Sequence, residues 1–344
     1  MAVISAYQLS KVYGDKKILS DFTIQIPEGE TFGLLGPANS GKTAFLRILA
    51  GLSMQTEGEC SILGLSPKMD IAKLHKMTGV VTETAKLYNH MTVDENLRFF
   101  ANLNEIDADD AIDRISFLLH NLDIWQYRDT KVELIPTNAM QRAHIARALV
   151  HSPKVLLLDE PTMEMDRETT ESVQYMMEHM RTQEGVTSLI CTRYPEHAEM
   201  ICTQLGIMKE ARLIAKGDFE ELRFSSGLQY EAEMRITMDS LLPIGFEHHD
   251  GIWRKAIEKE DDMPQIIADA IAHGCKIYEA KVKRPSLKQI SESFISGKYL
   301  EAKVGELHEE FSEFDEAEQW EESFSEAETN PQQELEQAGD DSIE

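Results

Sequence analysis

Two short segments carry residue types that bind and cleave phosphate anhydrides. Residues 36–43 read GPANSGKT, which matches the GxxxxGKT phosphate-binding loop, and residues 155–162 read VLLLDEPT. In such a loop, backbone amides and a helix N-terminus surround a phosphate, and the lysine neutralises its charge. A strand that ends in two carboxylates can supply a magnesium ligand and a base. The two motifs in this order predict a nucleoside triphosphate site.

The phosphate loop has the flanking segments that this motif requires. The strand-like TFGLL precedes it and the helical TAFLRILAGL follows it. Lys42 is expected to neutralise the β and γ oxygens, and the Thr43 hydroxyl to ligate Mg²⁺. Asn39 stands at a position that needs positive φ, which Asn tolerates best after glycine. The residues expected to bind ATP are Gly36, Pro37, Ala38, Asn39, Ser40, Gly41, Lys42 and Thr43.

The second motif supplies the chemistry at the phosphate end. Asp159 ends the apolar run VLLL and is expected to hold Mg²⁺. Glu160 follows it and is the candidate to polarise an attacking water. Without the phosphate loop, this pair of carboxylates would be an unremarkable surface feature.

Charge and composition indicate which kinds of partner and which cellular compartment to expect. The net charge is −27, and more than half of it lies in residues 301–344, which carry 17 acidic residues against one lysine. An acidic chain disfavours nucleic acid as a partner. The sequence contains no run of about 18 apolar residues, so no membrane span is predicted. The alternating MAVISAYQLSKV predicts a first strand and no signal peptide. Four scattered cysteines without CxxC pairing indicate core positions, no zinc site and a reduced cytoplasmic compartment.

Three regions follow one another along the chain. Residues 1–223 alternate short apolar runs with amphipathic stretches at 94–104 and 165–182, which predicts an α/β domain with a partly parallel sheet. Residues 226–300 predict a small α+β module, with a loop at His248–Gly251 and a helix near 263–273. Residues 301–344 form an acidic tail that is expected to be disordered.

Because of these motifs and their order, residues 1–223 resemble the nucleotide-binding subunit of an ATP-binding cassette (ABC) transporter. The resemblance is nearest to the branch that energises drug, antibiotic and lantibiotic export. The resemblance implies a P-loop NTPase fold with a mixed sheet and a helical subdomain. It also implies a transmembrane permease partner, a cytoplasmic place on the inner face of the membrane, and a homodimer or heterodimer. The segment KRPSLKQISESFISG at 283–297 resembles the PSL-type helix start of the small C-terminal module in such exporters.

Two further residues take roles from this resemblance. Tyr13 in KVYGDKKIL resembles the aromatic residue that stacks on adenine, although a Tyr at a strand end can also be an amphipathic cap. Glu83 falls where the family has the Gln or Glu of its Q-loop, which senses Mg²⁺ and contacts the membrane subunit. The alternative for Glu83 is a solvated loop carboxylate.

The signature motif departs from the family pattern. Residues 135–139 read IPTNA where the family has LSGGQ, whose Ser and Gly amides reach the partner's γ-phosphate across a dimer. Pro136 has no amide hydrogen, and the Cβ atoms of Thr137 and Asn138 obstruct close backbone approach. In the D-loop, Asp166 is retained, while Glu164 stands where Gly is common.

Arg193 stands where the family has its switch histidine. Arginine keeps a positive charge near the γ-phosphate but does not exchange a proton near neutral pH. His197 lies four residues later, and a rescue by His197 would need the loop to slip. In a homodimer both composite sites are incomplete, and in a heterodimer with an intact partner neither is whole. We therefore expect tight binding of MgATP with impaired hydrolysis, with Glu160 and Arg193 as the catalytic candidates.

Two functions remain open on the sequence. One is an ATP-binding subunit that drives a separate permease. The other is a degenerate ATP-dependent sensor that does not turn over. The tail, with Phe311, Phe314, Trp320 and Phe324 among its carboxylates, predicts either a solubilising extension or an amphipathic segment that docks on a basic surface of a membrane partner.

Overall fold

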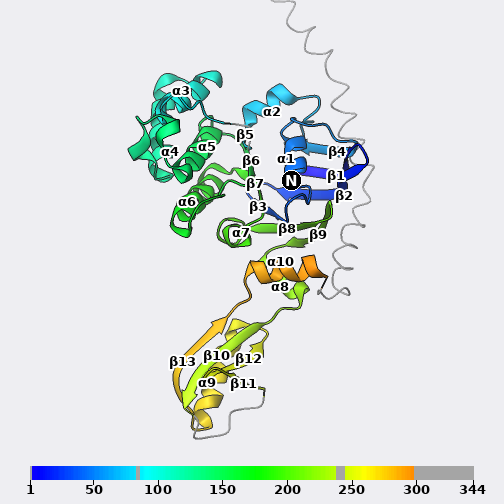
Figure 1. Cartoon of the computed structure of the whole chain (residues 1–344), viewed down its shortest axis with the longest axis vertical. Coiled ribbons are helices and arrows are strands. Elements are labelled where there is room, and N and C mark those ends of the chain that lie inside the picture. Colours follow the sequence, from blue (N-terminus) through cyan, green and yellow to red (C-terminus); the bar gives the residue numbers. More distant parts are fainter. Residues whose placement is uncertain (1, 83–85, 238–244, 298–344) are drawn as a thin grey trace, which may run out of the picture. The chain divides into compact units, whose positions relative to one another are not determined.

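A six-stranded sheet forms the centre of the computed structural model, which describes residues 2–82, 86–237 and 245–297 (Figure 1). Its strands in spatial order are β5 (Thr78–Val81), β6 (Val155–Asp159), β7 (Thr187–Thr192), β3 (Thr31–Leu35), β8 (Gln204–Lys209) and β9 (Arg212–Gly217). All pairs are parallel except β8–β9. Runs such as VLLL are buried on both faces, as parallel strands require. The predicted partly parallel sheet is confirmed.

A second, antiparallel sheet contains the N-terminal strand. Its order is β2 (Lys16–Pro27), β1 (Ala2–Tyr13) and β4 (Glu57–Ile62). Helix α1 (Lys42–Leu49) shares a core with it, in which Phe22 and Phe45 lie 4.6 Å apart between ring centroids. The short α2 (Ile71–Met77) follows β4. The expected first strand is confirmed.

Helices α3 to α5 gather into a separate helical group (Figure 1). The helices between β5 and β8 are α3 (Val93–Leu103), α4 (Ala108–Asn121), α5 (Thr137–Leu149), α6 (Arg167–Glu184) and α7 (Pro195–Ile201), with short 3-10 turns at Trp125–Tyr127 and Val132–Leu134. The helices expected at 94–104 and 165–182 are therefore present as α3 and α6. Asp166 caps α6 by accepting a hydrogen bond from the amide of Thr169 at 2.8 Å.

The third sheet is antiparallel and carries helix α9 (Met263–Ala272) on one face (Figure 1). Its order is β11 (Glu247–His249), β12 (Ile252–Ile257), β10 (Tyr230–Thr237) and β13 (Lys276–Lys283), and a 3-10 turn at Glu260–Asp262 precedes α9. The loop expected to begin at His248 is wrong by two residues, because β11 continues through His249. Asp250 and Gly251 then turn the chain with φ of 51° and 80°, as a two-residue hairpin of type I′ requires.

Two helices flank this third sheet in the chain, α8 (Phe219–Ser226) before β10 and α10 (Leu287–Ser296) after β13. Ser286 and Gln289 form a capping box at the start of α10, which confirms the predicted helix start. The described residues all fall in one compact unit. The division at 223–226 stays a prediction, and the acidic tail lies outside the described residues.

Two expectations from composition can be compared with the fold. Cys60, Cys191 and Cys275 are buried, whereas Cys202 is half-buried at the end of α7, so the expected core position is only partly right for it. Among the residues that the structure describes, no helix combines the length and apolar character that crossing a membrane requires.

Candidate functional site

The loop between β3 and α1 has a backbone that only a few residue types allow. Gly41 has φ of 110°, and a Cβ there would lie 2.6 Å from the carbonyl oxygen of Ile18. A Cβ on Gly36 would lie 2.6 Å from the carbonyl oxygen of Met208. Asn39 has φ of 63°, as expected from its tolerance of the left-handed region. The loop therefore closes tightly, with its glycines against neighbouring backbone.

The start of α1 is suited to an anion. Gly41 is its N-cap and no side chain caps the helix, so the first amides have neither a side-chain nor an intrahelical partner. The Lys42 ammonium is buried and donates to the carbonyl oxygens of Gly36 at 2.7 Å and Pro37 at 2.9 Å. Burial lowers the pKa of Lys42, while nearby groups that include Glu160 and Asp159 act to raise it. Free helix amides beside a buried cation fit a phosphate group.

Two of the three residues expected to hold magnesium, Thr43 and Asp159, lie next to each other. The Thr43 hydroxyl donates to Oδ1 of Asp159 at 3.2 Å. Burial raises the pKa of Asp159, the bond from Thr43 lowers it, and the charge of Glu160 raises it further. A half-buried carboxylate beside a second carboxylate favours a cation, and hard oxygen ligands suit Mg²⁺. Glu83, the third expected magnesium residue, lies outside the described residues.

Glu160 is held by contacts from the next strand of the sheet. Its backbone, with φ of 48°, donates to the carbonyl oxygen of Cys191 at 2.8 Å. Its Oε2 accepts hydrogen bonds from the hydroxyl of Thr192 at 3.0 Å and from the amide of Arg193 at 3.3 Å. The sequence analysis did not identify Thr192, although a hydroxyl at the end of a strand beside the one that ends in Asp159 is a recognisable signal.

The side chains of Arg193 and His197 point to different environments. The Arg193 guanidinium contacts Sδ of Met163 at 3.8 Å and lies 5.3 Å from the ring centroid of Tyr194. His197 lies in α7, as expected, and its Nδ1 is 2.9 Å from the hydroxyl of buried Thr162. Arg193, and not His197, lines the pocket described next.

One pocket of about 760 Å³ brings the predicted residues together. From the predicted set it is lined by Tyr13, Ala38, Asn39, Ser40, Gly41, Lys42, Thr43, Asp159, Glu160 and Arg193. Gly36 and Pro37 do not line the pocket, but their carbonyl oxygens accept hydrogen bonds from the Lys42 ammonium. Lys86 and His144 also line the pocket, and the sequence analysis did not identify them.

Tyr13 stands at one side of this pocket with an exposed ring. Its hydroxyl oxygen lies 3.0 Å from Oγ of Ser53, and this hydrogen bond lowers the pKa of Tyr13. The ammonium of Lys11 lies 4.5 Å from the ring centroid. The ring is thus held at both its edge and one face, which makes it a fixed surface for stacking.

His144 is a buried residue of the same pocket. Burial lowers its pKa to about 4, and the positive charges of Arg147 and Lys86 act in the same direction. The ring is therefore neutral at neutral pH. A histidine in the middle of QRAHIARAL, among apolar and small residues, was the sequence signal for a buried polar group.

Residues 135–139 lie at the start of α5. Pro136 is the N-cap with φ of −58°, no side chain caps the helix, and the amide of Met140 donates to the Pro136 carbonyl oxygen at 2.9 Å. Helix geometry leaves the amides of Thr137 and Asn138 without intrahelical partners. Position 136 therefore supplies no capping hydroxyl, while α5 still begins at Thr137, within the segment that corresponds to the family signature.

Comparison with known proteins agrees with this geometry. The ABC transporter family model matches residues 19–163. The linearmycin resistance ATP-binding protein LnrL of Bacillus subtilis is 25% identical over 303 residues, covering 84% of this chain and 96% of the relative. The Nod factor export ATP-binding protein I of Burkholderia thailandensis is 34% identical over 219 residues, covering 63% of this chain and 71% of the relative.

Solved structures share the fold. An ATP-binding subunit of an ABC transporter matches with a TM-score of 0.61 at 23% identity, covering 66% of this chain and 94% of that structure. A dimeric bacterial ABC transporter cassette matches with a TM-score of 0.58 at 24% identity, covering 62% and 98%. With the phosphate loop, the carboxylate strand and these relatives in agreement, the chain belongs to the ATP-binding subunits of ABC transporters.

Proposed function

We propose that this chain binds MgATP in the pocket at 36–43, dimerises around it and drives a separate exporter-type permease, with slow hydrolysis. The observation that carries the proposal is the convergence of Lys42, Thr43, Asp159 and Glu160 on one pocket. The chain places a buried cation, a hydroxyl and two carboxylates at the start of α1, which is the set that phosphoryl transfer uses.

Each of these residues has a defined task in binding. Lys42 and the free amides of α1 bind phosphate oxygens, and Tyr13 stacks on the base. Thr43 and Asp159 would hold Mg²⁺, with Glu83 as the proposed third residue. When bound, Mg²⁺ supplies positive charge to the phosphate oxygens.

Glu160 is the proposed general base. Thr192 and the Arg193 amide fix one carboxylate oxygen at 3.0 and 3.3 Å, so the group is oriented before reaction. Glu160 accepts the proton that the attacking water loses as its oxygen bonds to the γ-phosphorus and the bond to the β-phosphate oxygen breaks. Arg193 contributes positive charge at the γ-phosphate.

Two substitutions support slow turnover. Arg193 supplies charge but no proton exchange near neutral pH, and Pro136 supplies no capping hydroxyl at the start of α5. Loss of one preorganised donor to transition-state charge costs on the order of 100-fold to 1000-fold in rate. Arginine at position 193 keeps a positive charge beside the pocket, so binding is expected to stay tight.

The names of the relatives support an exporter role and a membrane partner. One confers linearmycin resistance and another exports Nod factor, and a solved cassette is dimeric. We propose a cytoplasmic subunit at the inner face of the membrane, held there by the permease, as a homodimer or a heterodimer. The acidic charge argues against a nucleic-acid partner.

The second candidate function, an ATP-dependent sensor without turnover, is favoured by the same residues at 136 and 193. Restoring the family pattern tests whether these positions limit turnover. The variant combines Ile135→Leu, Pro136→Ser, Thr137→Gly, Asn138→Gly and Ala139→Gln with Arg193→His, and the exposed Arg212→His serves as control.

The restored variant is expected to gain about 100-fold in ATP turnover over the unchanged chain, while the control gains nothing. No gain would show that positions 136 and 193 do not limit the rate. Co-purification of the unchanged chain with a membrane protein distinguishes the subunit from the sensor, since the subunit needs a permease.

A further inference from the structure

Helix α10 links the third sheet to α7, the helix that follows the switch position Arg193. Strand β13 ends at Lys283, and α10 begins four residues later at Leu287. Helix α10 packs against α7 and α8, with Leu287, Ile290 and Phe294 fully buried. Helix α7 begins at Pro195, two residues after Arg193.

Glu199 of α7 joins the two helices with both of its oxygens. Oε1 accepts a hydrogen bond from Arg284 at 2.9 Å, and Oε2 accepts one from the backbone amide of Leu287, also at 2.9 Å. Leu287 is the first residue of α10, so the carboxylate sits at the positive end of that helix. Charge-assisted hydrogen bonds of this kind are stronger than neutral ones, and Glu199 is largely shielded, with 21% of its side chain exposed.

Helix α7 packs against α6, β3 and β7 as well as α10, through the buried Ala198 and Ile201. It spans seven residues, and no side chain caps its N-terminus at Tyr194. Toward the site, Nδ1 of His197 lies 2.9 Å from the hydroxyl of Thr162, and the amide of Tyr194 donates to the hydroxyl of Thr192 at 3.1 Å. Because α7 begins two residues after Arg193, its position bears on where the Arg193 amide meets the Glu160 carboxylate.

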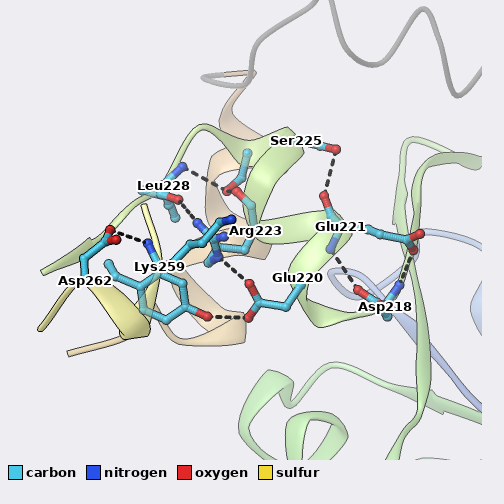
Figure 2. Close-up of polar contacts among 10 residues, drawn as sticks. Asp218, Glu220, Glu221, Arg223, Ser225, Leu228, Lys259 and Asp262 are labelled. Carbon is cyan, nitrogen blue, oxygen red and sulfur yellow. Dashed lines mark hydrogen bonds and ion pairs between the residues drawn. The ribbon is translucent and has the colours of Figure 1, made fainter. Parts of the chain in front are cut away.

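The chain enters the third sheet through α8, which is also held by polar contacts. Figure 2 shows those of Glu220 and Arg223. The Arg223 guanidinium donates to Glu220 at 2.8 Å, and the hydroxyl of Tyr230, the first residue of β10, donates to Glu220 at 2.6 Å. Arg284 lies 4.6 Å from the ring centroid of Phe219 in α8. The chain segments that lead into and out of the third sheet are thus tied to each other and to α7.

We propose that Glu199 is a positioning residue for ATP turnover: through Arg284 and the N-terminus of α10 it fixes α7 and so holds the Arg193 amide on Glu160. The inference rests on the proposed function of that pocket. It makes the rate of hydrolysis depend on the C-terminal segment 284–296, which does not contact the reacting atoms.

The first test is Glu199→Gln in the full chain, which keeps the shape of the side chain and removes its charge. Single-turnover hydrolysis is expected to slow on the order of tenfold, because sub-ångström to ångström misplacement of reacting groups has effects of this size or larger. The affinity for ATP is expected to change less than about twofold, since none of the loop contacts involve α7.

Matched variants separate positioning from general stability. Arg284→Lys keeps the charge and is expected to keep most of the rate, whereas Arg284→Gln should match Glu199→Gln, and the double variant should be no slower than either. Lys288→Gln removes a looser pair, 3.9 Å from Glu196 with both side chains exposed, and serves as control. Fully additive losses, or an equal loss in Lys288→Gln, overturn the proposal.

Amide hydrogen exchange supplies a readout that does not require hydrolysis. Glu199→Gln is expected to speed exchange at 193–197 while strand 155–159 stays protected, and unchanged exchange at 193–197 overturns the proposal. If the unchanged chain shows no hydrolysis at all, the proposed turnover fails, and the exchange experiment still decides whether Glu199 holds the switch segment.

Discussion

The backbone amide of Arg193 donates a hydrogen bond to the Glu160 carboxylate at 3.3 Å. This contact comes from the main chain, so it does not depend on which side chain stands at position 193. Under the proposed function, arginine in place of the family's histidine would change the chemistry offered to the γ-phosphate and leave this support of Glu160 in place. Binding and base orientation can persist where proton exchange is lost.

Replacing the base tests its assignment directly. Glu160→Gln is expected to lower single-turnover hydrolysis at least about 100-fold, because general-base catalysis contributes that much or more. ATP affinity should stay within a few-fold. Glu164→Gln, a nearby carboxylate of the D-loop, serves as control. Retained hydrolysis in Glu160→Gln would assign the base elsewhere.

Thr192 is predicted to orient that base. Thr192→Val removes the hydroxyl that donates to Glu160 at 3.0 Å and keeps the volume of a buried side chain. A lost hydrogen bond to a charged group is worth about 1.5–3 kcal/mol, so turnover should fall roughly 10-fold to 100-fold. Rapid-quench measurement with ATP affinity measured in parallel checks this. A fall in affinity with no change in rate contradicts the assigned role.

Tyr13 is predicted to contribute stacking energy to ATP binding. Tyr13→Ala should weaken binding about tenfold or more, since stacking of a base on an aromatic ring is worth about 1–3 kcal/mol. Tyr13→Phe keeps the ring and loses only the bond to Ser53, so it should bind nearly as well as the unchanged chain. Equal affinity in Tyr13→Ala, measured by calorimetry, would leave Tyr13 as a strand cap.

Buried His144 is predicted to make the free energy of unfolding depend on pH. Burial lowers its folded-state pKa to about 4, below the unfolded value of 6.5, so the unfolded chain binds the proton more readily. The stabilising effect of neutral His144 is complete above pH 6.5 and is lost as the pH falls toward 4, by about 3 kcal/mol in all. Urea unfolding of His144→Gln should show a flatter decline between pH 7 and pH 4.5. The exposed His120→Gln should decline like the unchanged chain, and an equally steep decline in His144→Gln contradicts the prediction.

The sequence was most informative where a local motif dictates local geometry. The phosphate loop places Lys42 and Thr43 by spacing alone, and the positive φ of Asn39 follows from the motif. The contact between Thr43 and Asp159, the pair expected to hold Mg²⁺, followed from the order of the two motifs, although the two residues lie far apart in the chain.

Contacts that depend on packing between distant segments were not predictable. Nothing in the local sequence connects Glu199 with the start of α10, or Tyr13 with Ser53, because each partner is exposed or polar and has many alternatives. His144 carried a weak signal, a polar residue on a buried helix. Arg147 lies three residues later on the same helix, whereas Lys86 comes close to His144 only in the fold.

The most direct test is MgATP binding and single-turnover hydrolysis by the purified chain, with Lys42→Ala as the blank. We predict that the unchanged chain binds MgATP tightly and that Lys42→Ala does not, because Lys42 is the buried cation of the pocket. We also predict that the unchanged chain hydrolyses ATP about 100-fold more slowly than the variant restored at 135–139 and 193. Binding equal to that of Lys42→Ala, or hydrolysis as fast as in the restored variant, would contradict these predictions.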